Sequence, residues 1–269
     1  MRVPRFLPVI ALSLAMVAGA TASARAQGPE ERSSDVPIPS LLEPATLLSV
    51  GWIVDPDAIR DRARVLGSEK EGDIEERSLT VFDRLFVPPV VAGTAIDPGD
   101  LVLFYRPGET VVDPETDAVW GQLLLPTGVG RVEELVAEVA RVTVTEAFAP
   151  VEIGQGVRTI APSDTLVTPD PDGPADADGY VLLYRPEKAV HPPYDVAFLR
   201  VESGVLAPGA TIRLFREGKT RRGYRLPPVE LGRAMVVRAE GEIATAVLTS
   251  VERSDLRRGD RFREVEEER

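Results

Sequence analysis

The chain contains two copies of one sequence pattern, and this duplication constrains its fold more than any other feature. Both copies share a Pro-Gly pair, an aromatic-Arg pair, a Gly-x-Thr group and later glycines and arginines. The matched residues are Pro98, Gly99, Arg106, Gly108 and Thr110 with Pro208, Gly209, Arg216, Gly218 and Thr220 at an offset of 110; Pro126, Gly130 and Arg131 with Pro228, Gly232 and Arg233 at 102; and Gly156 and Arg158 with Gly259 and Arg261 at 103. Copies of this length indicate duplicated domains rather than a solenoid.

Each copy consists of short runs rich in Val, Leu, Thr and Phe that are separated by glycine and proline, a pattern typical of β-strands. The expected strands are 79–87, 101–106, 142–148, 180–184, 211–215 and 244–251. Sheets this small avoid exposed edges by closing into barrels or packing as sandwiches. The sequence therefore predicts a mainly β fold of two tandem, related, small β-barrel or sandwich-like units, preceded by a short helix at 55–66.

One run in the first copy fits both a helix and a hairpin. Its apolar residues recur at helical spacing, and they are Val132, Leu135, Val136 and Val139. The aligned segment 238–242 of the second copy contains Ala-Glu-Gly, which is typical of a turn between two strands. We therefore expect hairpins over 131–148 and 233–251.

Residues 1–26 have the three parts of a signal peptide. Two arginines precede an apolar stretch at 7–20, and Ala24 and Ala26 have the small-x-small arrangement that a signal peptidase requires. The apolar stretch is too short for a permanent anchor, and no later run is long enough to span a membrane. We expect cleavage near Ala26 and a periplasmic or secreted location.

An acidic segment rich in proline and glycine separates the two copies. The expected organisation is 1–26 signal peptide, 27–48 flexible tether, 49–160 first β unit, 161–178 linker, 179–264 second β unit and 265–269 acidic tail. The linker places carboxylates in alternation with glycines, as calcium loops do, at Asp170, Asp172, Asp176 and Asp178. It lacks the distal bidentate glutamate, so a solvated linker is the alternative to a calcium site, and no other cofactor is expected.

The residues that are absent restrict the chemistry. The chain has no cysteine and a single histidine, which excludes thiol catalysis and multi-histidine metal sites. His191 lies in Ala-Val-His-Pro-Pro, where we expect an exposed turn, and no nucleophile motif accompanies it. No acidic pair stands out as a glycosidase pair. We therefore expect no catalytic residue.

Basic residues concentrate in one hairpin of the second copy. The candidate anion-binding residues are Arg216, Lys219, Arg221, Arg222 and Arg225, with Tyr224 among them. Arginine matches the geometry of carboxylates and phosphates, such as those of peptidoglycan and lipopolysaccharide. The corresponding loop of the first copy is acidic, so the two loops could instead bind each other, within or between chains; it contains Glu109, Asp113, Glu115 and Asp117. A net charge of −12 argues against nucleic acid.

The motifs of the first copy resemble a known family region. The segments 98–100 (PGD), 104–108 (FYRPG) and 113–116 (DPET) resemble the β-rich region that follows LysM modules in bacterial envelope proteins and, more weakly, the C-terminal domain of a flagellar assembly protein. That pattern ends in Gly-Asp, which the second copy has at 259–260, whereas the first has Gly-Val at 156–157. No LysM module precedes residue 51, so the resemblance implies an envelope context without implying peptidoglycan binding or catalysis.

These observations favour an exported, non-catalytic envelope protein that binds or scaffolds in the periplasm or at the cell wall. Its expected partner is a cell-wall polymer such as peptidoglycan, or an envelope protein, and self-association is an alternative. The second hypothesis is an assembly subunit of an envelope or flagellar-type machine, and the third is an envelope hydrolase.

Overall fold

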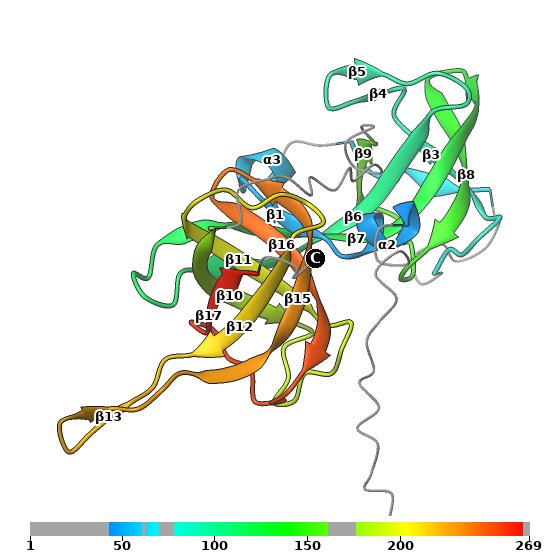
Figure 1. Ribbon diagram of the computed structural model, residues 1–269. Coiled ribbons are helices and arrows are strands. Elements are labelled where there is room, and N and C mark those ends of the chain that lie inside the picture. Colours follow the sequence, from blue (N-terminus) through cyan, green and yellow to red (C-terminus); the bar gives the residue numbers. More distant parts are fainter. Residues whose placement is uncertain (1–42, 61–62, 70–77, 161–175, 266–269) are drawn as a thin grey trace, which may run out of the picture. The chain divides into compact units, whose positions relative to one another are not determined.

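Strand pairing divides the described chain into two β-rich parts (Figure 1). A computed structural model describes residues 43–60, 63–69, 78–160 and 176–265. The expected signal peptide, most of the expected tether, Asp170 and Asp172 of the expected linker and the last four residues lie outside these ranges. The prediction of a mainly β fold is confirmed, because nearly all elements are antiparallel strands.

The second part is a closed barrel of six strands. Its strands, in the order in which they pair, are β10 (Asp178–Arg185), β11 (Val196–Ser203), β16 (Ile243–Val251), β15 (Val229–Glu240), β12 (Thr211–Arg216) and β17 (Arg261–Glu264). β17 pairs with β10 and so closes the circle. Alternate residues point inward and fill the barrel, which gives a core that contains Val181, Leu199, Leu214, Val236 and Phe262.

The first part repeats this strand order. Its strands, as they pair, are β2 (Gly67–Ser68), β3 (Arg84–Val87), β8 (Val139–Ala147), β7 (Val119–Val136), β6 (Leu101–Val112) and β9 (Gly156–Thr159), with β1 (Trp52–Val54) added beside β7. A small hairpin joins β3 to β6 and consists of β4 (Val90–Val91) and β5 (Thr94–Ala95). The two ends of the sheet meet where Arg64 forms a bridge with Gly156 and the Val65 amide donates to Gln155 O at 2.9 Å. The contacts at 63–65 thus join the two ends of this seven-stranded sheet, and we call the first part the first barrel.

Matched turns confirm that the two parts are copies. Phe82 and Tyr194 both have positive φ, of 71° and 75°, and donate their amides to Val144 O and Leu248 O. A left-handed backbone at a large aromatic residue is uncommon. Its occurrence at both positions shows that one turn has been kept in both copies.

The offsets later in the repeat differ from those expected. A β-bulge follows Phe104 in the first copy and Leu214 in the second, and these residues pair with Gly128 and Gly232, which gives an offset of 104 rather than 102. The first copy has glycines at both 128 and 130, and an alignment of glycines alone could not show which of them matches Gly232.

The closing strands are also offset differently. The amide of Gly154 donates to Val65 O, as that of Gly259 donates to Val181 O, both at 2.8 Å. The offset is therefore 105, not 103. The counterpart of the closing Gly-Asp is Gly-Gln at 154–155, and the expected match with 156–157 was wrong.

The ambiguous run at 132–139 is a hairpin. Val136 pairs with Val139 across a two-residue turn, and Glu240 pairs with Ile243 in the second copy. Both expected hairpins are confirmed, and the helix is excluded.

The helix expected at 55–66 is much shorter. Of the described residues in this stretch, only α3 (Asp57–Arg60) is helical, and Asp55 Oδ1 accepts the amide of Asp57 at its start. The amide of Val157 donates to Ala63 O at 2.8 Å, because the chain at 63–65 closes the first barrel. Tertiary pairing thus overrides the helical spacing.

A second short helix, α2 (Pro44–Ser49), lies in the last part of the expected tether. Leu47 of this helix packs against Met235, Val237 and Val247 on the second barrel. In the part of the chain that the structure describes, no helix has the length and the hydrophobicity needed to cross a membrane.

Candidate binding site

Each barrel extends one hairpin beyond its wall. In the first copy β6 and β7 continue as residues 107–124, which we call the first arm; in the second copy residues 217–228 form the second arm, which contains β13 (Thr220–Arg221) and β14 (Tyr224–Arg225). A glycine lies at the base of each arm, Gly108 and Gly218, where an added Cβ would come within 2.9 Å of Leu123 and 1.8 Å of Leu226 O. Only glycine fits at such approaches.

The first arm packs against the wall of the second barrel. Val111 and Leu123 of the arm form one buried cluster with barrel residues that include Leu182 and Phe198. Both arm residues are fully buried. This apolar contact stabilises the arm in its extended position, since burying each such side chain contributes about 1.5–3 kcal/mol.

A buried carboxylate lies in the same contact. Asp113 Oδ2 accepts hydrogen bonds from Tyr180 Oη at 2.6 Å and Trp120 Nε1 at 2.8 Å, and Oδ1 accepts the amides of Glu115 and Thr116 at 2.8 and 3.0 Å. Burial alone would raise the pKa of Asp113, but these four donors outweigh it and hold that pKa well below its ordinary value. Burial, and then the hydrogen bond to Asp113, raises the pKa of Tyr180.

Charged contacts surround this buried centre. Glu109 lies 3.2 Å from Arg258 and 3.9 Å from Arg185, and Glu115 lies 3.5 Å from Arg261. The acidic loop therefore binds arginines of the second barrel wall and not the basic hairpin. The guanidinium of Arg200 also lies over the ring of Trp120, at 4.1 Å from its centroid.

The second arm is exposed along its length. Figure 1 shows it extending away from its own barrel, and its two strands pair only with each other. Arg222 and Gly223 have positive φ, as a tight hairpin turn requires. Tyr224 is 77% exposed. Arg225 pairs with Glu217 at 2.7 Å, whereas no ion pair to a described acidic residue is found for Lys219, Arg221 or Arg222.

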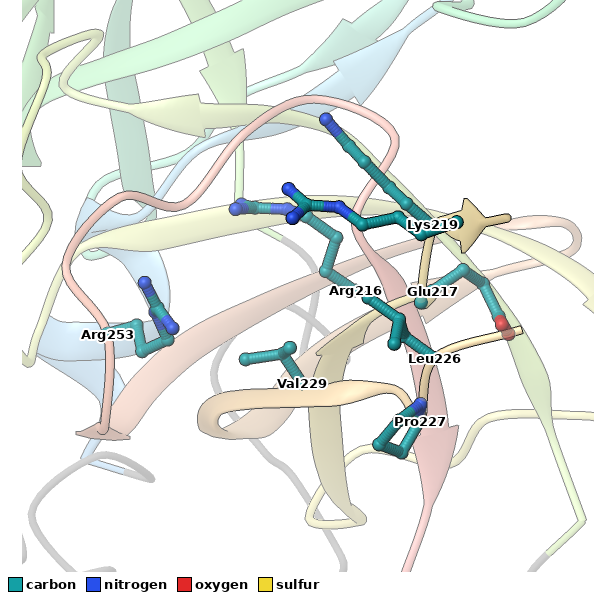
Figure 2. A pocket seen from close by; sticks show the side chains of 9 residues that line it. Arg216, Glu217, Lys219, Leu226, Pro227, Val229 and Arg253 are labelled. Atoms are coloured by element: carbon teal, nitrogen blue, oxygen red, sulfur yellow. The ribbon is translucent and has the colours of Figure 1, made fainter. Parts of the chain in front are cut away.

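A hollow of about 360 Å³ lies at the base of the second arm (Figure 2). Its lining residues are Arg216, Glu217, Gly218, Lys219, Arg221, Leu226, Pro227, Val229 and Arg253. Figure 2 shows the side chains of Arg216 and Lys219 on one side of the hollow and those of Leu226, Pro227 and Val229 on the other. Arg253 lies outside the predicted basic hairpin, and it reaches the base of the arm because its amide donates to Leu231 O of β15 at 3.1 Å.

Arg216 differs from the other basic residues of the hollow. Its Nε and Nη2 donate to Asp260 at 2.7 and 2.9 Å, and its Nη1 donates to Asp255 Oδ2 at 2.9 Å. The hydrogen bonds to Asp260 and Asp255 raise the pKa of Arg216 although burial opposes this, and the pKa of Asp255 is lowered in turn. The charge of Arg216 is thus compensated, while Lys219, Arg221 and Arg222 are the cations of the predicted set that no described acidic residue pairs with.

The calcium ligands remain a prediction. Asp176 and Asp178 are described, and Asp178 begins β10, where its Oδ1 accepts a hydrogen bond from Ser203 Oγ at 3.0 Å. Within the described ranges, no group of three or more acidic or histidine side chains is arranged to hold a metal ion.

His191 is not in an exposed turn, so that expectation was wrong. The side chain is 3% exposed, and its Nδ1 lies 2.9 Å from Asp195 Oδ2. Its ring centroid lies 4.9 Å from that of Tyr184, and Lys188 Nζ donates to Asp195 at 3.0 Å. The histidine is buried because its ring contacts the carboxylate of Asp195, which lies at the matched turn before β11. The residues next to His191 in the sequence give no sign of this contact.

No protein-family model matches the chain. A search of curated proteins also finds no match. The proposals below therefore depend on the geometry described above.

Proposed function

We propose that the chain is an exported, non-catalytic protein of the cell envelope that binds an anionic partner through its second arm. The observation that carries this proposal is the exposed hairpin with Lys219, Arg221 and Arg222 unpaired by the described acids, next to Tyr224. An aromatic ring beside guanidinium groups suits sugars that bear carboxylates or phosphates. The carboxylates of peptidoglycan and the phosphates of lipopolysaccharide share this chemistry.

Other polar groups already form hydrogen bonds within the chain, which supports a non-catalytic role. Asp113 is held by four donors within the chain, and His191 is buried beside Asp195. Rigid β barrels that display charged loops are typical of binding modules.

Co-sedimentation of the mature chain with purified sacculi tests the proposal. We expect salt-sensitive pelleting, and replacement of Arg221, Arg222 and Arg225 by Gln should weaken it about tenfold, since each exposed ion pair contributes about 0.2–1 kcal/mol. The matched control replaces Arg131, Arg233 and Arg263, which are exposed on the barrel walls and outside both arms. Equal loss of pelleting in both variants, or no pelleting at low salt, would exclude wall binding through this arm.

An assembly subunit is the second candidate function. The observation that favours it is the first arm, which already uses the matching element of the fold to bind a neighbouring barrel.

A further inference from the structure

The two arms arise at the same point of the same fold, but only the first has a docking partner among the described residues. The first arm binds the wall of the second barrel through Leu182, Phe198 and Arg185. If both arms serve as docking elements, the second arm should bind a barrel wall like the one that the first arm binds. The first barrel, as a copy of the second, offers one.

The matching wall can be located from backbone pairing. Val65 exchanges hydrogen bonds with residues 154–155 as Val181 does with 259–260. Gly67 then pairs with Phe86 as Leu183 pairs with Phe198. The counterparts of Leu182, Phe198 and Arg185 are therefore Leu66, Phe86 and Glu69.

This wall of the first barrel is open. Leu66 is 53% exposed, whereas its counterpart Leu182 is fully buried under the first arm. Beside it lies a hollow of about 530 Å³, and its lining residues are Glu69, Phe82, Asp83, Arg84, Glu133 and Thr143. Phe82 is 83% exposed. Two exposed apolar side chains therefore border a hollow that is otherwise lined mainly by charged residues.

In the second barrel, the part of the wall that matches this hollow is covered by α2. Val237 and Val247 are the counterparts of Glu133 and Thr143, and Leu47 of α2 packs against both valines. This part of the wall thus binds an apolar segment in the second copy, whereas the matching part of the first copy presents polar side chains. The first barrel is therefore suited to a polar, cationic segment.

The charges of the second arm and the first barrel wall are the reverse of those of the first arm and the second barrel wall. Glu109 of the first arm lies near Arg185; at the offset of 110 the second arm has Lys219, and the wall has Glu69. The aromatic residue is kept, because at the offset of 104 Tyr224 corresponds to Trp120. Glu69 already binds Arg84 and Arg141. This wall nevertheless has four acidic residues for those two arginines, because it also contains Asp83, Glu133 and Glu134.

We infer that the second arm of one copy binds the Leu66–Glu69 wall of the first barrel in a second copy, with Lys219 beside Glu69 and Tyr224 against the apolar surface. This inference rests on the proposed function and identifies the anionic partner of the second arm as a second copy of the chain. The contact is heterologous, because arm and wall are different surfaces, so successive copies form a ring or an open filament rather than a two-fold dimer.

Sedimentation velocity of the mature chain without sacculi tests the inference. We expect an average mass that rises with protein concentration, and about tenfold weaker association in each of K219E and E69K, since like charges then face each other. An equimolar mixture of the two variants should associate like the wild type, because each arm then meets a wall of opposite charge. R263E, on an exposed residue of β17 outside both surfaces, is the matched control and should not change the mass.

Each outcome decides the inference. A wild-type chain that stays monomeric at all concentrations overturns it, as does a mixture that fails to restore association. If circular dichroism shows that E69K disturbs the fold, Leu66→Ser tests the same wall without touching the ion pairs of Glu69. Pelleting with sacculi by a monomeric chain overturns only this inference, whereas association without pelleting overturns only the proposed wall binding.

Discussion

Asp113 is the residue on which the contact between the first arm and the second barrel is centred. Its carboxylate is 2% exposed and accepts four hydrogen bonds. We expect Asp113→Ala to lower the free energy of unfolding by about 2–4 kcal/mol, because it leaves the buried donors of Tyr180 and Trp120 unpaired. Urea denaturation measures this loss, and Tyr180→Phe, which removes only one donor, should cost about 1 kcal/mol.

The same carboxylate gives a pH dependence with a defined sign. Its pKa is lower in the folded chain than in the unfolded chain, so the unfolded state takes up the proton first as the pH falls. The stabilisation is complete above about pH 4 and is lost progressively below it. Acid titration of unfolding should show a steeper loss below this pH in the wild type than in Asp113→Asn. Parallel curves for the two chains would contradict this assignment.

At the scale of elements, the two hairpin turns form a matched pair. Ala137 in the β7–β8 turn has φ of 53°, and Gly241 in the β15–β16 turn has φ of 59°. A side chain is strained in this region and glycine is not. We expect Ala137→Gly to raise the free energy of unfolding by about 0.5–1 kcal/mol and Gly241→Ala to lower it by a similar amount. Thermal melting of both variants measures the effect, and a loss of stability in Ala137→Gly would refute the explanation by backbone strain.

Sequence patterns predicted where several strands lie, but they did not predict how far a strand continues. Alternating runs located β8, β10, β12 and β16 within a few residues, because half-buried strands repeat every two positions. β6 continues through Pro107 and Gly108 into the first arm, where glycine permits a close strand contact instead of ending the strand. The helix at 55–66 was predicted too long because local spacing does not show that Ala63 and Val65 close a barrel. Of the candidate site, the basic hairpin was visible in the sequence, but the pairing of Arg216 with Asp260 was not, since the two residues meet only across the closed barrel.

The whole molecule contains one apolar cluster that both barrels share. Ile53, Val111 and Leu123 from the first part are buried with Leu182 and Phe198 from the second. Backbone contacts also group the described residues as one compact unit. We expect a single unfolding transition in calorimetry, since neither barrel can lose this cluster alone without exposing the other.

A variant of the shared cluster tests this cooperativity. Leu123→Ala should cost about 2–5 kcal/mol, and combined with Asp113→Ala it should separate the transition into two. The matched control is Leu214→Ala, which empties the core of the second barrel alone and should lower stability without separating the transition. Two transitions in the wild type would show that the barrels unfold independently.

The closure of the second barrel by β17 determines when folding can finish. β17 is the last strand that the structure describes, and it pairs with β10, the first strand of that barrel, and with β12. Until β17 has been synthesised, both of those strands keep an unpaired edge, and such edges are templates for aggregation. Contacts between distant parts of the sequence also form slowly. Completion of this barrel therefore has to wait for the synthesis of β17, and a chain that stops before Arg261 retains two open edges.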